Sequence, residues 1–219
     1  MEQILFDEFY QACGNGDLEK VKECIEKGVD VDYTKGDKRT GLMRSAKRGF
    51  DEIVSYLVSK GADVNARDTD NKDALMGAAK HGNLGCCRIL IENGSKVNSH
   101  DNVGRTALMR AAYNGYIHVV ELLLDSGAEI DSIDDKGRTA LMEAVVAVKV
   151  DIVKLLLSRG ANINKQDNEG CTSLMRASYS GYGDLVLYLL SEGADKEIKD
   201  HTLKKALDYC PDELKDIFK

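Results

Sequence analysis

Six cysteines and four histidines are the residues that could supply a nucleophile, a disulfide bond or a metal site in this chain of 219 residues. The cysteines form no C-x-x-C pair, and no histidine stands at metal-ligand spacing from a cysteine, which argues against a zinc site. The sequence also lacks H-E-x-x-H, G-x-S-x-G and a glycine-rich phosphate loop. We therefore expect a protein that is not an enzyme, with no cofactor and no metal, and its basic and aromatic residues become the candidates for binding.

Leucine recurs with a fixed period of 33 residues, at Leu42, Leu75, Leu108, Leu141, Leu174 and Leu207. Glycine follows the same period, at Gly28, Gly61, Gly94, Gly127, Gly160 and Gly193. Such a period indicates a stack of one structural unit, in which each unit buries its apolar face against its neighbours. We predict a single elongated domain over residues 1–219, with repeats at 1–34 (an N-terminal cap), 35–67, 68–100, 101–133, 134–166, 167–199 and 200–219 (a C-terminal cap).

The repeat at residues 101–133 indicates its own elements most clearly. Asp101 and Gly104 favour a turn at its head. Thr106 is suited to cap a first helix over residues 107–114, and Gly115 to end it in a left-handed conformation. A more apolar second helix is expected over residues 117–125, followed by an extended connector. Each unit is thus predicted to be a turn, two short antiparallel helices and a connector.

This unit resembles the ankyrin repeat, whose pattern is D-x-x-G-x-T-P-L-H-x-A-A-x-x-G-H-x-x-V-V-x-x-L-L-x-x-G-A-x-x-N. Residues 101–128 match that pattern at Asp101, Gly104, Thr106, Leu108, Ala111, Ala112, Gly115, Val119, Val120, Leu123, Leu124, Gly127 and Ala128. The resemblance implies an all-α ankyrin-repeat solenoid with β-hairpin-like connectors, whose hairpin tips and first helices line a concave face. Animal members can be hydroxylated at the asparagine before the turn, and that modification stays open here for Asn65, Asn98 and Asn164.

Two departures from the family pattern are informative. The T-P-L-H motif reads T-A-L-M, and we expect its methionines to be core residues rather than part of a cofactor site: Met43, Met76, Met109, Met142 and Met175. Val148 replaces the glycine of a short turn, as at Gly115. Because a β-branched residue is strained in the left-handed conformation, we expect that turn to be built differently.

The two ends differ from the internal units, as the ends of a repeat array should. We expect Asp7 to cap the first helix and Pro211 to begin a short final helix. The N-terminal residues lack the basic and apolar regions of a signal peptide, and no apolar run is long enough to insert in a membrane. We therefore expect a monomeric, intracellular protein of the cytoplasm.

The repeat register also separates the cysteines. Five fall on core positions, where a free cysteine behaves as a small hydrophobe: Cys13, Cys24, Cys86, Cys87 and Cys210. Cys171 instead stands at a turn position that other units give to Arg105 and Arg138. We expect its thiol to be exposed.

Basic residues gather at the positions through which ankyrin-type arrays contact partners. The residues before the capping position are Arg39, Lys72, Arg105, Arg138, Cys171 and Lys204, and the outward first-helix positions hold Arg44, Lys47, Arg48, Lys80, His81, Arg110, Glu143 and Arg176. Acidic turn residues reduce this excess without cancelling it, although the whole chain has a net charge of −7. We predict a basic concave face and an acidic convex back; the alternative is that exposed positions are simply often charged.

Tyr113 and Tyr179 occupy the same position two repeats apart, with Val146 between them. Aromatic residues flanked by arginines, here Arg110 and Arg176, are the usual composition of an interface hot spot. We predict that these residues bind a partner; alternatively, the tyrosines only pack against neighbouring first helices.

The favoured function is a non-catalytic scaffold or adaptor that binds a protein partner through an acidic segment, phosphorylated or not, in the concave groove. The alternative is an inhibitor or regulatory subunit that masks a folded partner enzyme. Nucleic-acid binding through the same face is disfavoured by the acidic back.

Overall fold

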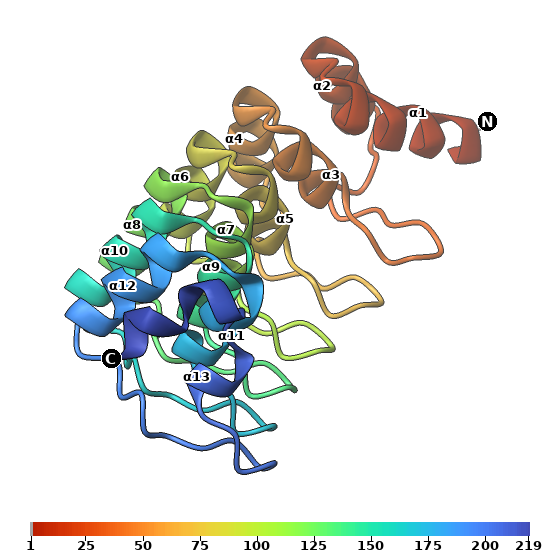
Figure 1. The fold of residues 1–219 in the computed structure, drawn as a ribbon. Coiled ribbons are helices and arrows are strands. Elements are labelled where there is room, and N and C mark those ends of the chain that lie inside the picture. The colour runs from red at the N-terminus through yellow and green to blue at the C-terminus, as the bar shows by residue number, and fades with distance from the viewer. Residues whose placement is uncertain (1) are drawn as a thin grey trace.

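The computed structural model describes residues 2–219, so Met1, which begins the predicted N-terminal cap, lies outside the described residues. The chain folds into short helices, most of them in antiparallel pairs (Figure 1). Their bounds are α1 Glu2–Asn15, α2 Leu18–Glu26, α3 Gly41–Arg48, α4 Asp51–Ser59, α5 Ala74–His81, α6 Leu84–Glu92, α7 Ala107–Asn114, α8 Ile117–Asp125, α9 Ala140–Val146, α10 Val150–Ser158, α11 Ser173–Ser180, α12 Gly183–Ser191, α13 Ala206–Tyr209 and the 3₁₀-helix η1 Asp212–Phe218. Within residues 2–219 the connectors form no strand, only an isolated bridge between Thr34 and Thr40. The all-α prediction is therefore confirmed.

The pairs stack into a curved array with the two termini at opposite ends (Figure 1). The odd-numbered helices form one row, in which α3 packs on α5, α5 on α7 and α7 on α9. The even-numbered helices form a second row beside it, and the connectors project as a series of finger-like loops on the opposite side of the first row (Figure 1). Each element thus contacts mainly the units next to it, as a repeat array requires.

Local sequence signals set the helix ends. Thr106 Oγ1 accepts a hydrogen bond from the N–H of Met109 at 3.3 Å, and Gly115 ends α7 with φ of 90°. In α5 an aspartate takes the threonine's place, and Asp73 Oδ1 accepts from the N–H of Met76 at 2.8 Å. These caps satisfy backbone donors that have no partner inside the helix. The predicted bounds of α7 and α8 are both confirmed.

The core runs continuously through the stack and contains the periodic leucines of the first helices from α3 to α11. Leu207 on α13 is 38 % exposed and lies outside it. The five methionines of the T-A-L-M positions are buried, which confirms them as core residues. Five of the six free cysteines are buried as predicted, whereas Cys171 is only half-exposed. Because Cys171 is only partly exposed, the expectation of an exposed thiol is correct only in part. Burial and the neighbouring Asp167 raise the pKa of this thiol.

Two expectations about turns and ends are wrong. Asp7 lies inside α1, which already begins at Glu2, and it pairs with Lys35 at 2.7 Å instead of capping a helix. Val148 keeps the left-handed turn, with φ of 55°. The N–H groups of Val148 and Lys149 bond to the carbonyls of Val145 and Ala144, the same pairing that the Gly115 turn makes with residues 112 and 111. The hydrogen bonds of the turn therefore outweigh its strain.

The C-terminal end follows the prediction more closely. Pro211 precedes η1, which buries Phe218, and Lys196 Nζ donates to the carbonyl oxygen of Phe218 at 2.8 Å. From Glu2 to Lys219, no helix has the length and hydropathy that crossing a membrane demands.

Candidate partner-binding face on the first helices

Buried aspartates at the start of each turn neutralise many of the predicted basic residues. Asp101 shows the arrangement: its Oδ1 accepts from the N–H groups of Val103 and Arg105, both at 2.9 Å, and its Oδ2 pairs with Arg110. A buried carboxylate is costly unless it is hydrogen-bonded and paired with a cation. The pairs of this kind are Asp68 with Arg39, Asp101 with Arg110, Asp134 with Arg138 and Asp167 with Arg176.

Glu143 corrects the predicted charge map of the face. It is only 3 % exposed, rather than outward-facing, and its carboxylate lies 3.0 Å from Arg138 and 3.7 Å from Arg105. Arg110 is likewise not a free surface cation, because its side chain is 10 % exposed and held by Asp101. The reason is geometric: the first-helix position occupied by these residues packs against the turn, where the buried carboxylates lie.

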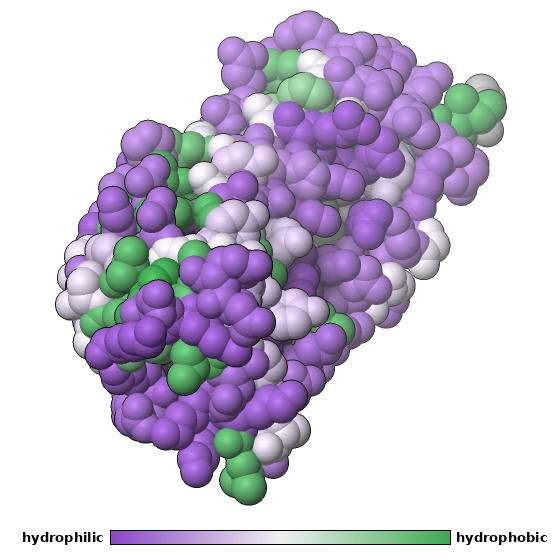
Figure 2. Space-filling model, viewed as in Figure 1, coloured by the Kyte–Doolittle hydropathy of each residue, from purple (hydrophilic) through white to green (hydrophobic). Residues whose placement is uncertain are grey.

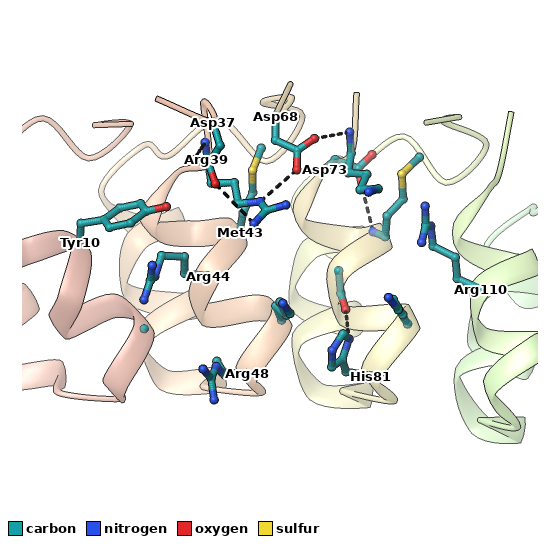
Figure 3. Close-up of a pocket in the computed structure, with 16 residues that line it drawn as sticks. Tyr10, Asp37, Arg39, Met43, Arg44, Arg48, Asp68, Asp73, His81 and Arg110 are labelled. Carbon is teal, nitrogen blue, oxygen red and sulfur yellow. Dashed lines mark hydrogen bonds and ion pairs between the residues drawn. The ribbon is translucent and has the colours of Figure 1, made fainter. Parts of the chain in front are cut away.

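Four predicted cations have no carboxylate within ion-pair distance among residues 2–219: Arg44, Lys47, Arg48 and Lys80, here called the cationic cluster. They line a cavity of about 240 Å³ between the first helices of the N-terminal repeats (Figure 3). Seven arginine or lysine side chains and three aspartates line this cavity. Lys72, which also lines it, is paired with Asp70 at 2.7 Å. The cations of the predicted basic face that have no ion-pair partner among the described residues are thus concentrated at α3 and α5.

The ionisable groups of the cavity reflect this excess of positive charge. Burial lowers the pKa of Lys47, and the nearby charges of Arg39, Lys80, Arg48 and Arg44 lower it further. Burial also lowers the pKa of His81, whose Nδ1 lies 3.2 Å from the carbonyl oxygen of Gly77. This lowering favours the neutral form of the His81 imidazole. An anion entering the cavity would meet unneutralised lysine and arginine side chains.

Residues of α1 fix the position of Arg44, a role that the sequence did not reveal. The guanidinium of Arg44 lies over the ring of Tyr10, 4.3 Å from its centroid (Figure 3). It also lies against Gly14, where an added Cβ would stand 2.2 Å from Arg44 Nη2. Stacking on an aromatic face suits the planar guanidinium and restricts its motion. The helix predicted as a cap therefore also shapes the cavity.

Gly77 is a second residue that the sequence reasoning missed, although its signal was visible. The same first-helix position reads Arg44, Gly77, Arg110, Glu143 and Arg176 in successive repeats. Only Gly77 lacks a side chain there, and it lines the cavity. A break in an otherwise charged series could have marked the cavity in advance.

The predicted apolar contact residues lie farther along the same row of first helices. Tyr113 on α7, Val146 on α9 and Tyr179 on α11, here called the tyrosine stripe, are 47 %, 40 % and 76 % exposed. Such exposure disfavours the alternative that these residues serve only to pack helices. Figure 2 shows a mostly polar surface over the N-terminal repeats and more hydrophobic side chains around the C-terminal helices.

The asparagines before the turns have a structural use. Asn65 Nδ2 donates to the carbonyl oxygen of Gly94 at 3.1 Å, and its Oδ1 accepts from the N–H of Lys96 at 2.9 Å. Asn98 makes the equivalent pair of bonds to Gly127 and Glu129 in the next unit. These amides join neighbouring repeats, and their hydroxylation stays untested.

One group of side chains among residues 2–219 has the spacing of a metal site: Asp167, Glu169 and Cys171. Asp167, however, already accepts from the N–H groups of Glu169 and Cys171 at 2.9 Å and pairs with Arg176. Its carboxylate is therefore committed to the turn. No metal is assigned, and the absence of a metal stays a prediction.

Comparisons with known proteins identify the family. The family model described as ankyrin repeats (3 copies) matches residues 9–101, 63–134 and 108–200. The solved ankyrin repeat domain of Bcl-3, described as a unique member of the IkappaB protein family, has a TM-score of 0.85 and 29 % identity, covering 96 % of this chain and 97 % of that one. The human ASB11 ankyrin repeat domain has a TM-score of 0.89 and 24 % identity, covering 95 % of each chain. A comparison with curated protein sequences found no match. The matched residues span most of the sequence, and the chain belongs to the ankyrin repeat family.

Proposed function

We propose that this chain is a non-catalytic protein–protein interaction module, a scaffold or adaptor, that binds an acidic segment of its partner along the row of first helices. Ankyrin repeats are generally interaction modules, which supports the coarse function. The observation that carries the finer proposal is the cationic cluster, whose four side chains have no ion-pair partner among the residues that the structure describes, in a chain of net charge −7. Cations held close together repel one another, so an anionic segment would relieve that repulsion.

The tyrosine stripe supplies a second kind of contact for the same segment. Aromatic side chains carry much of the free energy of binding in interfaces, while exposed charges mainly speed and orient the encounter. An extended segment lying along the row would place acidic residues at α3 and α5 and an apolar residue near Tyr113. The proposal includes a monomeric state, since the stacking contacts join only neighbouring units. It also includes a location in the cytoplasm. Light scattering, which measures the molar mass in solution, tests the monomeric state.

Selection of short random peptides on the immobilised protein tests the proposal. We expect the enriched peptides to be acidic and to contain an apolar or aromatic residue. The double variant Lys47→Glu, Arg48→Glu should lose this enrichment. Its matched control is Arg88→Glu, Lys96→Glu, which reverses two exposed charges outside the cavity.

Three results would contradict the proposal. Enrichment of acidic peptides that is equal on both double variants would place the binding site elsewhere. Recovery of nothing but a folded partner enzyme, with no peptide enriched, would favour the inhibitor instead. Enrichment of nucleic acid over acidic peptides in a parallel selection would contradict the proposal that the partner is a protein.

A further inference from the structure

Gly77 creates the cavity by breaking a recurrent ion pair. In α7 and α11, the arginine at the equivalent position pairs with the aspartate nine residues earlier, as Arg110 does with Asp101 and Arg176 with Asp167. Gly77 stands nine residues after Asp68 and cannot reach it. Arg39 of the preceding repeat holds Asp68 instead, with its Nε 3.1 Å from Asp68 Oδ2. The missing side chain leaves open space, because a Cβ at Gly77 would meet nothing nearer than Lys47 Cβ at 3.7 Å.

The charges of the cavity are segregated. At the end nearest the turns, Asp37 and Asp68 are paired with Arg39 (Figure 3). Asp73 lies 3.5 Å from Arg67, which is outside the cavity lining. At the other end, the labelled Arg44 and Arg48 have no drawn interaction (Figure 3). The Nε of Arg44 is buried and has no hydrogen-bond partner among the described residues. The aspartates are therefore already neutralised, and the cationic cluster lines the cavity together with Gly77, with Lys47 nearest to it.

The number and kind of these cations favour one anion over another. A phosphoryl group carries about −1.5 to −2 charges at pH 7 and three strong acceptor oxygens. A carboxylate carries a single charge, so it would leave most of the cationic cluster without a partner. Arginine also binds phosphate through two parallel hydrogen bonds, and a guanidinium held in place loses little freedom in forming them. Arg44, stacked on Tyr10, is held in this way.

We propose that the cavity beside Gly77 binds the phosphoryl group of a phosphoserine or phosphothreonine in the partner segment, contacted by Arg44, Lys47, Arg48 and Lys80. This inference rests on the proposed function and narrows its acidic segment to a phosphorylated one. Phosphorylation of the partner would then control its binding.

Three libraries of random peptides, with a fixed central phosphoserine, aspartate or serine, test the inference on the full chain. We expect the protein to retain phosphoserine peptides at least about tenfold better than aspartate peptides, since a phosphoryl group adds charge-assisted hydrogen bonds that a carboxylate cannot make.

Two glycine variants separate a shaped site from a diffuse positive field. Gly77→Arg adds positive charge but fills the cavity, so it should abolish the phosphoserine preference, whereas a diffuse field would strengthen it. Gly14→Ala keeps every charge but displaces the guanidinium of Arg44, and it should reduce the preference several-fold. Arg88→Glu on α6 is the control and should change nothing. Circular dichroism and thermal unfolding check that each variant is folded.

The outcomes distinguish the inference from the function on which it rests. Equal retention of aspartate and phosphoserine peptides, both lost in Lys47→Glu, Arg48→Glu, would overturn the phosphoryl site and leave the acidic-segment proposal standing. Retention of no library would overturn both. Binding to phosphoinositide-containing vesicles that exceeds phosphopeptide binding and is lost in Gly77→Arg would assign the cavity to a membrane surface and overturn the inference as well.

Discussion

At Val148 a β-branched residue holds a conformation that glycine provides in equivalent turns, with φ of 55° against 90° at Gly115. The strain should exceed the entropy that an added glycine gives to the unfolded chain. We expect Val148→Gly to raise the free energy of unfolding by up to about 1 kcal/mol, measured by urea denaturation. Ala147→Gly is the control, because Ala147 has φ of −84° and no strain to lose, so it should destabilise. A lower free energy of unfolding in Val148→Gly would contradict the inference that the backbone at Val148 is strained.

Gly77 presents the opposite case, a glycine inside a helix with no positive φ. Because its added Cβ would make only ordinary contacts, Gly77→Ala should raise the free energy of unfolding by roughly 0.5–1 kcal/mol, the usual helical difference between these residues. Thermal unfolding measures the effect. Gly82→Ala is the matched control and should destabilise, since φ there is 74° and the Cβ would lie 2.4 Å from the Tyr116 ring. A destabilising Gly77→Ala would show that the cavity is not open.

Thiol reactivity provides a third test at single residues. Burial raises the pKa of Cys13 and of Cys87 to about 12, and a thiol reacts as its thiolate. Only Cys171 is partly exposed, so it should be the one thiol that Ellman's reagent labels in the folded protein. Its raised pKa makes that labelling slower than for a free thiol at pH 8 and faster as the pH rises. Native labelling that persists in Cys171→Ser would contradict the burial of the other five.

At the scale of the elements, Glu143 on α9 connects two successive turns through Arg105 and Arg138. Removing one partner of a fully buried ion pair costs about 3–5 kcal/mol, but without Glu143 both arginines would still share Asp134. Since the side chain of Arg105 is 35 % exposed, we expect Glu143→Ala to lower the free energy of unfolding by about 2 kcal/mol. Glu19→Ala, at an exposed pair with Lys22, should cost less than about 1 kcal/mol. Equal costs in urea denaturation would mean that Glu143 is not a structural anion.

The elements themselves were predictable where the signal is local. Thr106 and Gly115 bracket α7 because a capping hydroxyl and a left-handed glycine act within one helical turn. The prediction that Asp7 caps the first helix is wrong because a residue type that favours caps can also lie inside a helix. Nothing in the sequence marks the start of α1. The basic positions were likewise visible, but the pairing of Arg110 with Asp101 depends on how α7 packs against its turn. Periodicity gives the position of a side chain in the repeat and not its partner.

At the scale of the whole molecule, the array places two different surfaces along one row of helices. The cationic cluster lies on α3 and α5 near the N-terminal end, and the tyrosine stripe lies on α7, α9 and α11. The terminal unit does more than close the core, because Tyr10 and Gly14 of α1 orient Arg44. A partner that used both surfaces would have to follow the curve of the stack, which an extended segment can do.

The two surfaces should therefore contribute differently to the kinetics of binding, measured by surface plasmon resonance with a selected acidic peptide. Lys47→Glu, Arg48→Glu should slow association and weaken its dependence on salt, because exposed charges act mainly on the encounter. Tyr113→Ala, Tyr179→Ala should instead speed dissociation and cost on the order of 2 kcal/mol of affinity if either is a hot spot. Neither double variant should lower thermal stability much, since the tyrosines are exposed and the cations have no carboxylate partner in the described part of the chain. Unchanged affinity in the tyrosine double variant would remove the stripe from the interface and leave the cationic cluster as the sole contact on this face.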